Sequence, residues 1–168
     1  FTPYSKKIRS LLSEDILSET PAPLKQKNRV LDQDDIPQFQ DAYGKELNFS
    51  FDDFPLTESS ASQKLDDFID SSIQDYKVLR DIPSLSATSN LSSSFAIGLI
   101  SSKQAISHVL ARLPDEIGTG QFAWITEIIW REFYKYITYH FNHVSKGKSF
   151  NPKYDHISWR DDEASFLI

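Results

Sequence analysis

Four side chains of different chemistry fall within eight residues of one predicted helix. Glu127 supplies a carboxylate, Trp130 an indole, Arg131 a guanidinium and Tyr134 a phenol. At 100° per residue these four positions share one side of the helix. A face exposed only to water more commonly carries Lys, Glu and Ser, so this side is a candidate ligand-binding surface. The alternative interpretation is two core aromatics beside an ordinary i, i+4 pair of Glu127 with Arg131.

A second candidate segment, residues 88–92 with the sequence TSNLS, stands at the predicted start of a short helix. Its hydroxyl groups and the unpaired amides of a helix start suit the phosphates and ribityl hydroxyls of a nucleotide cofactor. Tyr76, Arg80 and Asp81 precede this segment on another predicted helix. Taken alone, a serine-rich helix start is more often a simple cap.

Other chemistries lack the residues they need. His140 and His143 have the spacing of two metal ligands, but neither a glutamate between them nor a third ligand follows from the sequence, so no metal site is predicted. Gly118-Thr-Gly120 precedes a predicted helix without the lysine of a phosphate-binding loop. The absence of cysteine excludes disulfides, Cys-type zinc sites, iron–sulfur clusters and thiol nucleophiles.

The elements that position these residues are predicted to be helices. Apolar residues recur at steps of three and four from Leu65 to Leu79, which predicts one helix of about five turns. It is expected to begin at a cap near Thr57 and to end before Pro83. Ser101 or Ser102 can cap the next helix, which ends at Pro114, and Gly98 suits the C-cap of the short helix before it.

The last predicted helix, residues 121–143, carries the first candidate surface on one side and an apolar stripe on the other. The stripe is expected to face the core, and it consists of Ile125, Ile129, Phe133, Tyr136 and Ile137.

Two regions are expected along the chain, because five of the eight prolines lie in the first 60 residues. Residues 1–56 are predicted to be an extended connector with one short helix over residues 5–12, anchored elsewhere by Phe49, Phe51 and Phe54. The alternative for this region is a solvated and partly disordered tail. Residues 57–168 are predicted to form an all-α unit, since strand alternation is nearly absent.

Composition limits the function classes. The formal net charge is −6, and residues 101–168 carry eight basic and eight acidic side chains, so any nucleic-acid interface must be a local patch. No stretch approaches the roughly 18 consecutive apolar residues of a membrane span, and the start shows no secretory signal. Because the chain starts at Phe1 and contains no Met, it is expected to be a fragment of a longer protein.

Together these motifs resemble the DNA photolyase and cryptochrome family, most closely the class I cyclobutane pyrimidine dimer photolyases. The resemblance is firm from Tyr76 to Trp159 and faint before it. It implies the helical N-terminal part of the FAD-binding domain, preceded by an extended interdomain connector. The motifs that carry it are Phe1-Thr-Pro-Tyr4, Tyr76 with Arg80-Asp81-x-Pro83, Thr88-Ser-Asn-Leu-Ser92 and Glu127-Ile-Ile-Trp-Arg-Glu-Phe-Tyr134.

The resemblance also implies roles for single residues. Asn90 departs from the family, which often has Arg there, so a backbone contact would remain whereas a guanidinium–phosphate pair would not. Trp124 is expected to line the same cavity as Glu127, and Trp159 to be the outermost member of an electron-transfer relay. The implied FAD contacts are Tyr76, Thr88, Ser89, Asn90, Leu91 and Ser92. The implied DNA contacts are Arg80, Glu127, Trp130, Arg131 and Tyr134, of which Glu127 and Trp130 would touch the dimer.

The activity implied by the resemblance is light-driven repair of cyclobutane pyrimidine dimers in DNA, by electron transfer from reduced FAD. An extrahelical dimer needs an aromatic platform and a hydrogen-bonding carboxyl group, which Trp130 and Glu127 offer. The intact parent would be a deoxyribodipyrimidine photo-lyase that also carries a folate or deazaflavin antenna chromophore in a missing N-terminal domain. The isolated chain is expected to be inactive. The parent is expected to be a monomer in the bacterial cytoplasm, with UV-damaged DNA as its partner and no membrane association.

Two alternatives remain open at this point. A cryptochrome-type blue-light photoreceptor shares the flavin motifs and lacks repair, and by family pattern Glu127 and Trp130 favour repair. A non-catalytic helical interaction domain would use the same aromatic face to dock a protein partner and would bind no flavin.

Overall fold

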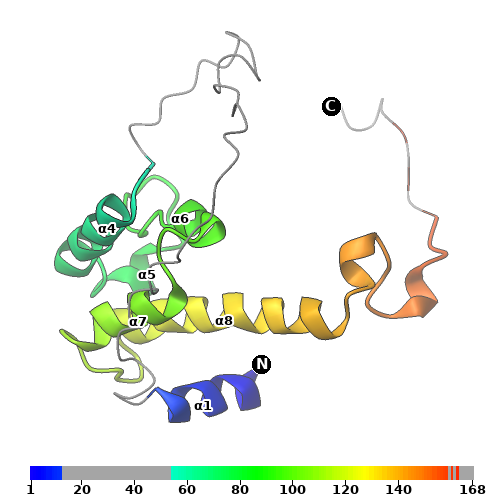
Figure 1. The fold of residues 1–168 in the computed structure, drawn as a ribbon, viewed down its shortest axis with the longest axis horizontal. Coiled ribbons are helices and arrows are strands. Elements are labelled where there is room, and N and C mark those ends of the chain that lie inside the picture. The colour runs from blue at the N-terminus through cyan, green and yellow to red at the C-terminus, as the bar shows by residue number, and fades with distance from the viewer. Residues whose placement is uncertain (13–53, 159, 161, 163–168) are drawn as a thin grey trace, which may run out of the picture.

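The computed structural model describes residues 1–12, 54–158, 160 and 162, and these residues form helices and turns with no strand. The longest helix is α8 (Gly120–His140), and the other helices pack around its first half. The first helix, α1 (Thr2–Leu11), lies on one side of α8, and α4, α5 and α6 lie on the other (Figure 1). The predicted all-α fold is confirmed.

The region predicted as one helix over residues 57–79 is two helices, so that prediction is wrong. Thr57 caps α4 (Glu58–Ser71) as predicted, since its side chain accepts a hydrogen bond from the amide of Ser60 at 3.1 Å. Residues 72–75 then turn, and a second helix, α5 (Tyr76–Leu79), begins. The apolar spacing continues through the turn, so periodicity alone does not reveal the break.

A glycine explains why the chain turns at this point. Gly120, at the start of α8, lies against the backbone carbonyls of Ile73 and Gln74, and a Cβ atom on it would overlap both oxygens. The turn therefore brings backbone against backbone, and it lets α5 run alongside α8. A continuous helix through residues 72–75 would not make this approach.

The next two helices follow the cap signals of the sequence. The short helix α6 (Ser92–Ile97) ends at Gly98 with φ +80°, a left-handed conformation that glycine adopts without strain. Ser101 caps α7 (Ser102–Leu110) by accepting a hydrogen bond from the Gln104 amide at 3.1 Å. The end of α7 lies at Leu110, one turn before Pro114.

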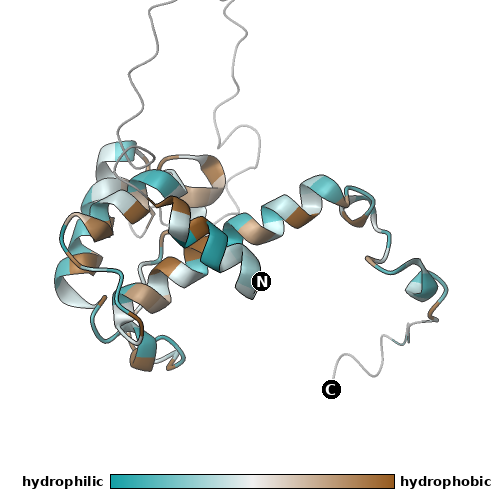
Figure 2. Ribbon diagram, turned by 90° about the horizontal axis from the view of Figure 1, so that it is seen from below, coloured by the Kyte–Doolittle hydropathy of each residue, from teal (hydrophilic) through white to brown (hydrophobic). Residues whose placement is uncertain are grey.

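The core lies where α4, α5, α6 and α7 meet the first half of α8. Of the predicted apolar stripe, Ile125 and Ile129 are buried, whereas Tyr136 is exposed and the stripe is wrong there. Beyond the core, α8 extends to His140 with hydrophobic residues among hydrophilic ones (Figure 2). Two 3-10 turns follow, η1 (Val144–Lys146) and η2 (Pro152–Tyr154). The largest fully buried hydrophobic side chains are Leu65, Ile73, Leu91, Ile100, Ile125, Ile129 and Val109.

The helix predicted over residues 5–12 begins earlier, at Thr2, because Pro3 fits the first turn of a helix. One end of α1 packs on α8 through Tyr4, whose ring lies 5.2 Å from that of Phe133. At the other end Arg9 forms an ion pair with Asp115 and donates to the Thr126 hydroxyl at 2.8 Å. Residues 13–53 of the predicted connector, including the expected anchors at residues 49 and 51, lie outside the described residues, and the third expected anchor, Phe54, is 42% exposed.

Candidate functional site

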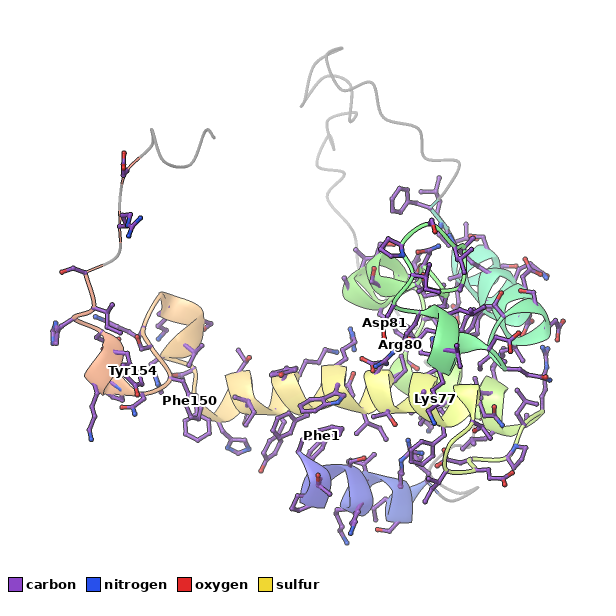
Figure 3. The ribbon with its side chains drawn as sticks, turned by 180° about the vertical axis from the view of Figure 1, so that it is seen from behind. Phe1, Lys77, Arg80, Asp81, Phe150 and Tyr154 are labelled. Atoms are coloured by element: carbon purple, nitrogen blue, oxygen red, sulfur yellow. The ribbon has the colours of Figure 1, made fainter. Side chains whose placement is uncertain are left out.

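The predicted ligand contacts on α5 and α8 form two layers. Tyr76 and Arg80 stand one turn apart on α5, and Trp124 and Glu127 stand one turn apart on α8. Because α5 packs along α8, Tyr76 and Trp124 are buried beneath, and Arg80 and Glu127 meet at the rim as an ion pair. Figure 3 shows Arg80 on the side of α8 that α5 covers.

Tyr76 is a neutral, buried phenol. Burial raises the pKa of its hydroxyl, and the carboxylate of Glu127 raises it further, while the Arg80 guanidinium opposes the shift. The ring packs edge-on against Phe68, with 5.8 Å between centroids, and Phe68 in turn lies 5.7 Å from Trp124. This aromatic cluster fixes the position of the Tyr76 side chain.

Trp124 connects α8 to the second candidate segment. Its indole Nε1 donates a hydrogen bond to the Ser89 hydroxyl, 3.3 Å away. Only 3% of Trp124 is exposed, so it belongs to the core of the described residues. The expectation that it lines the same cavity as Glu127 stays a prediction. Nothing in the sequence indicates this link, because residues 35 positions apart make it.

The TSNLS segment presents its polar groups outward. Thr88, Asn90 and Ser92 are exposed and Ser89 is half-buried. Leu91 is buried, with 1% exposure, so only its backbone can meet a ligand. Asn90 adopts φ +48°, accepts a hydrogen bond from Thr88 at 3.1 Å, and no side chain caps the start of α6. The exposed hydroxyls and helix-start amides fit the polar groups of a nucleotide cofactor such as FAD.

Trp130 contacts three other aromatic rings, one of which is Phe133, edge-on at 5.6 Å between centroids. Phe1 stacks on its indole with 3.4 Å between centroids and 7° between planes. Tyr134 stacks at 5.5 Å and 21°. Figure 3 shows Phe1 approaching α8 from the side of α1. A planar ligand can therefore stack only on the part of the indole that Phe1 and Tyr134 leave exposed.

The side chain of Arg131 bonds to groups on the neighbouring helices α6 and α7. Its guanidinium donates to the Phe95 carbonyl at 2.7 Å and to the Ser102 hydroxyl at 3.3 Å, and it pairs with Glu132. These contacts hold α6 and α7 on α8.

The four residues predicted to share one face of α8 therefore do not meet one common neighbour. Glu127 faces α5, Trp130 faces α1 with Tyr134 stacked on it, and Arg131 faces α6 and α7. The structure joins Glu127 to Arg80 and does not join Arg131 to either of them.

Other expectations concern residues outside this cluster. Trp159 lies outside the described residues, so its predicted relay role stays a prediction. Within the described part of the chain, no group of three or more His, Cys, Asp or Glu could hold a metal ion. In the same residues, no helix is both long and apolar enough to span a membrane.

Comparison with known proteins gives consistent matches. The chain is 41% identical over 110 residues to the deoxyribodipyrimidine photo-lyase of Agrobacterium fabrum, covering 65% of this chain and 22% of that protein. It is 29% identical over 171 residues to the protein of that name from Salmonella typhimurium, covering 99% and 35%. No protein-family model matches the chain.

A solved structure matches as well. The crystal structure of a bacterial class III photolyase from Agrobacterium tumefaciens superposes with a TM-score of 0.58 and 39% identity. The match covers 66% of this chain and 23% of that one. The chain thus spans about a fifth to a third of the length of the relatives it matches. The class I resemblance stays a prediction, since the matched structure is titled class III.

Proposed function

Because the chain belongs to the DNA photolyase family, we propose that it is part of a longer, light-driven enzyme that splits cyclobutane pyrimidine dimers in DNA. Residues 1–56 would be its interdomain connector, and residues 57–168 the N-terminal portion of its FAD-binding domain. The observation that supports this function is the packing of α5 on α8. It joins the expected flavin contact Tyr76 and the expected DNA contacts Arg80 and Glu127 in one cluster.

The residues of this chain would bind and orient two ligands. Thr88, Ser89 and Ser92 would hold polar groups of FAD through their hydroxyls, and Tyr76 would pack against it. Reduced FAD supplies the electron for the chemistry when it is bound. Glu127 would hydrogen-bond the edge of the extrahelical dimer.

The contact surface with damaged DNA would comprise the remaining candidate residues. Trp130 would contact the dimer through the part of its indole that stays exposed, and Arg80 would contact a backbone phosphate. Arg131 would act mainly by holding α6 and α7 on α8, and Tyr134 by stacking on Trp130, as their present contacts indicate. Trp159 would relay electrons to the flavin.

The test uses the full-length protein with UV-irradiated oligothymidylate under reducing conditions. We expect ultraviolet absorbance of the thymines to recover in blue light and not in the dark. Glu127→Ala and Trp130→Ala should each lower repair at limiting DNA by about tenfold, since each removes a contact to the dimer. Arg112→Gln, in the turn that follows α7, is a matched charge-removing control and should repair normally. Absence of recovery in the wild-type protein would contradict the proposal.

The contacts of Trp130 favour one second candidate. Because Phe1 and Tyr134 stack on the indole of Trp130, a dimer can contact less of its surface than it could on a fully exposed indole. A flavin photoreceptor without repair would tolerate this. A protein that shows the oxidised-flavin spectrum but no light-dependent recovery would support that candidate, and a protein without flavin would support a helical interaction domain.

The remaining features of the proposal concern the whole protein. We propose a monomer in the bacterial cytoplasm, where its DNA substrate lies, with a folate or deazaflavin antenna bound by sequence outside this chain. Size-exclusion chromatography and the absorption spectrum of the purified protein test these points.

A further inference from the structure

Arg80 and Glu127, each expected to contact DNA on its own, bind each other in this structure. The Arg80 Nη1 donates to the Glu127 carboxylate, and its Nε lies 3.6 Å from the carboxylate of Asp81. The guanidinium stands over the Tyr76 ring, 5.8 Å from the centroid. The Arg80 guanidinium therefore has two carboxylates within reach before any DNA arrives.

The ion pair of Arg80 with Glu127 is well placed to exchange partners. Both side chains remain accessible, with 34% of Arg80 and 42% of Glu127 exposed. Ion pairs this exposed contribute little to stability, because water and salt compete with them. A guanidinium, however, binds a phosphate through two parallel hydrogen bonds. An incoming phosphate can thus replace a carboxylate on Arg80 at small cost.

The residues beneath the pair keep both groups in place during such an exchange. Tyr76 and Trp124 are buried, and they form one aromatic cluster with Phe68. Arg80 lies one turn after Tyr76, and Glu127 lies one turn after Trp124. Because the cluster is packed, neither the Arg80 nor the Glu127 side chain can move into the core. Loss of the ion pair would leave the Glu127 carboxylate exposed and able to accept a new hydrogen bond.

We propose that Arg80 is a positioning residue for Glu127, and that a DNA phosphate and Glu127 compete for its guanidinium. The inference rests on the proposed function. On undamaged DNA a phosphate takes Arg80 and Glu127 gains no partner. On DNA with an extrahelical dimer, the released carboxylate bonds to the base edge. Binding of a backbone phosphate by Arg80 is therefore most favourable when Glu127 can bond to the dimer. This increases the difference in affinity between damaged and undamaged DNA.

A double-mutant cycle on DNA binding tests the competition. The full-length flavoprotein and its Arg80→Gln, Glu127→Gln and doubly substituted variants are titrated in the dark with undamaged and dimer-containing oligonucleotides. We expect Glu127→Gln to tighten binding of undamaged DNA by about fivefold, because Arg80 is then free for phosphate. In the Arg80→Gln background the same change should have no effect. An equal gain in both backgrounds would mean general charge repulsion and would overturn the proposal.

The salt dependence gives a second measurement that mere structural damage would not produce. Arg80→Gln should reduce the slope of log affinity against log salt by about 0.9, the value for one lost phosphate contact. Arg80→Lys keeps the charge and should keep the slope, while losing the Nη1 hydrogen bond that positions Glu127. A slope unchanged by Arg80→Gln, in a variant that retains its flavin spectrum, would contradict the phosphate contact.

A matched ion pair elsewhere provides the control. Arg112, in the turn that follows α7, pairs with Asp66 on α4 at 2.9 Å, and this pair lies away from α5 and α8. The corresponding cycle with Asp66→Asn and Arg112→Gln should show no coupling in DNA binding. Repair by the wild-type protein in light is measured in parallel. Absence of wild-type repair overturns the proposed function, whereas normal repair with an additive Arg80–Glu127 cycle overturns the exchange alone.

Discussion

At the scale of single residues, Glu132 shows how neighbouring groups determine the charge of a side chain. Burial alone would raise the pKa of its carboxyl group. The Ser102 hydroxyl donates to it at 2.6 Å, and the ammonium of Lys135 and the guanidinium of Arg131 lie beside it, so the pKa is lowered overall. Glu132 thereby joins the cluster that holds α7 on α8 and remains ionised there.

The lowered pKa of Glu132 predicts a pH-dependent contribution to stability. A carboxylate whose folded pKa is depressed stabilises the fold fully above its ordinary pKa of 4.5, and the contribution is lost as pH falls through the lower folded value. Glu132→Gln should therefore lower the free energy of unfolding by about 0.5–1 kcal/mol at neutral pH. The deficit should shrink between neutral pH and an acidic pH below the lowered folded pKa.

Denaturant unfolding of the full-length wild-type and Glu132→Gln proteins at both pH values is the measurement. A deficit of the same size at both would show that the charge of Glu132 contributes nothing, and that the loss comes from packing alone.

At the scale of elements, the division of one face of α8 among its neighbours arises from where those helices cross it. The approach of the α4–α5 turn to the start of α8 sets the position of α5, and Gly120 permits that approach. With α5 in place, Arg80 reaches Glu127, and Lys77 lies within 3.3 Å of the Gly118 carbonyl. The geometry of the candidate site therefore depends on a contact that involves none of its functional side chains.

Gly120→Ala tests this dependence. The added methyl group would overlap the carbonyl oxygens of Ile73 and Gln74, so the turn must move or α8 must shift. We expect a loss of about 1–3 kcal/mol in the free energy of unfolding, typical of overpacking, together with weaker flavin retention.

Gly147→Asn is the matched control for Gly120→Ala. Gly147 has φ +74° with open space around it, and Asn tolerates that conformation, so little change is expected. Wild-type stability and flavin content in Gly120→Ala would show that the close approach is not required.

At the scale of the whole molecule, the ring contacts of the described helices with α8 reach as far as Tyr136, which the Tyr4 ring of α1 approaches to 5.8 Å. Past Tyr134, side chains such as Tyr139 and Phe150 are exposed, by 80% and 57%. The chain also spans only 22% to 35% of the two photo-lyases compared. A flavin enclosed by the complete domain would need further polypeptide around the TSNLS segment, because that segment is open to solvent on the present surface.

We therefore expect the isolated 168-residue chain to lose its flavin and to show no repair, while the full-length protein retains both. The measurement is the oxidised-flavin absorbance per protein after gel filtration, with circular dichroism to establish that the isolated chain is helical. Stoichiometric flavin on the helical isolated chain would show that the described residues suffice for the cofactor.

Features determined by local chemistry could be predicted from the sequence. The caps at Thr57, Gly98 and Ser101 depend on residues within a few positions of one another, and each lies where predicted. The all-α class follows from apolar spacing, which is equally local. The choice of Tyr76 and Glu127 as candidate site residues came from the family motifs.

The arrangement of those residues required the tertiary structure. The turn at residues 72–75 keeps the apolar spacing of a helix and is fixed by Gly120 on another element. Arg80 and Glu127 lie 47 positions apart, and Trp124 and Ser89 lie 35 apart. Whether such pairs meet depends on how two helices cross, which is set by the packing of the whole core. The sequence alone determined which chemical groups are present, whereas the packing of α1, α5 and α6 on α8 decided which of them act together.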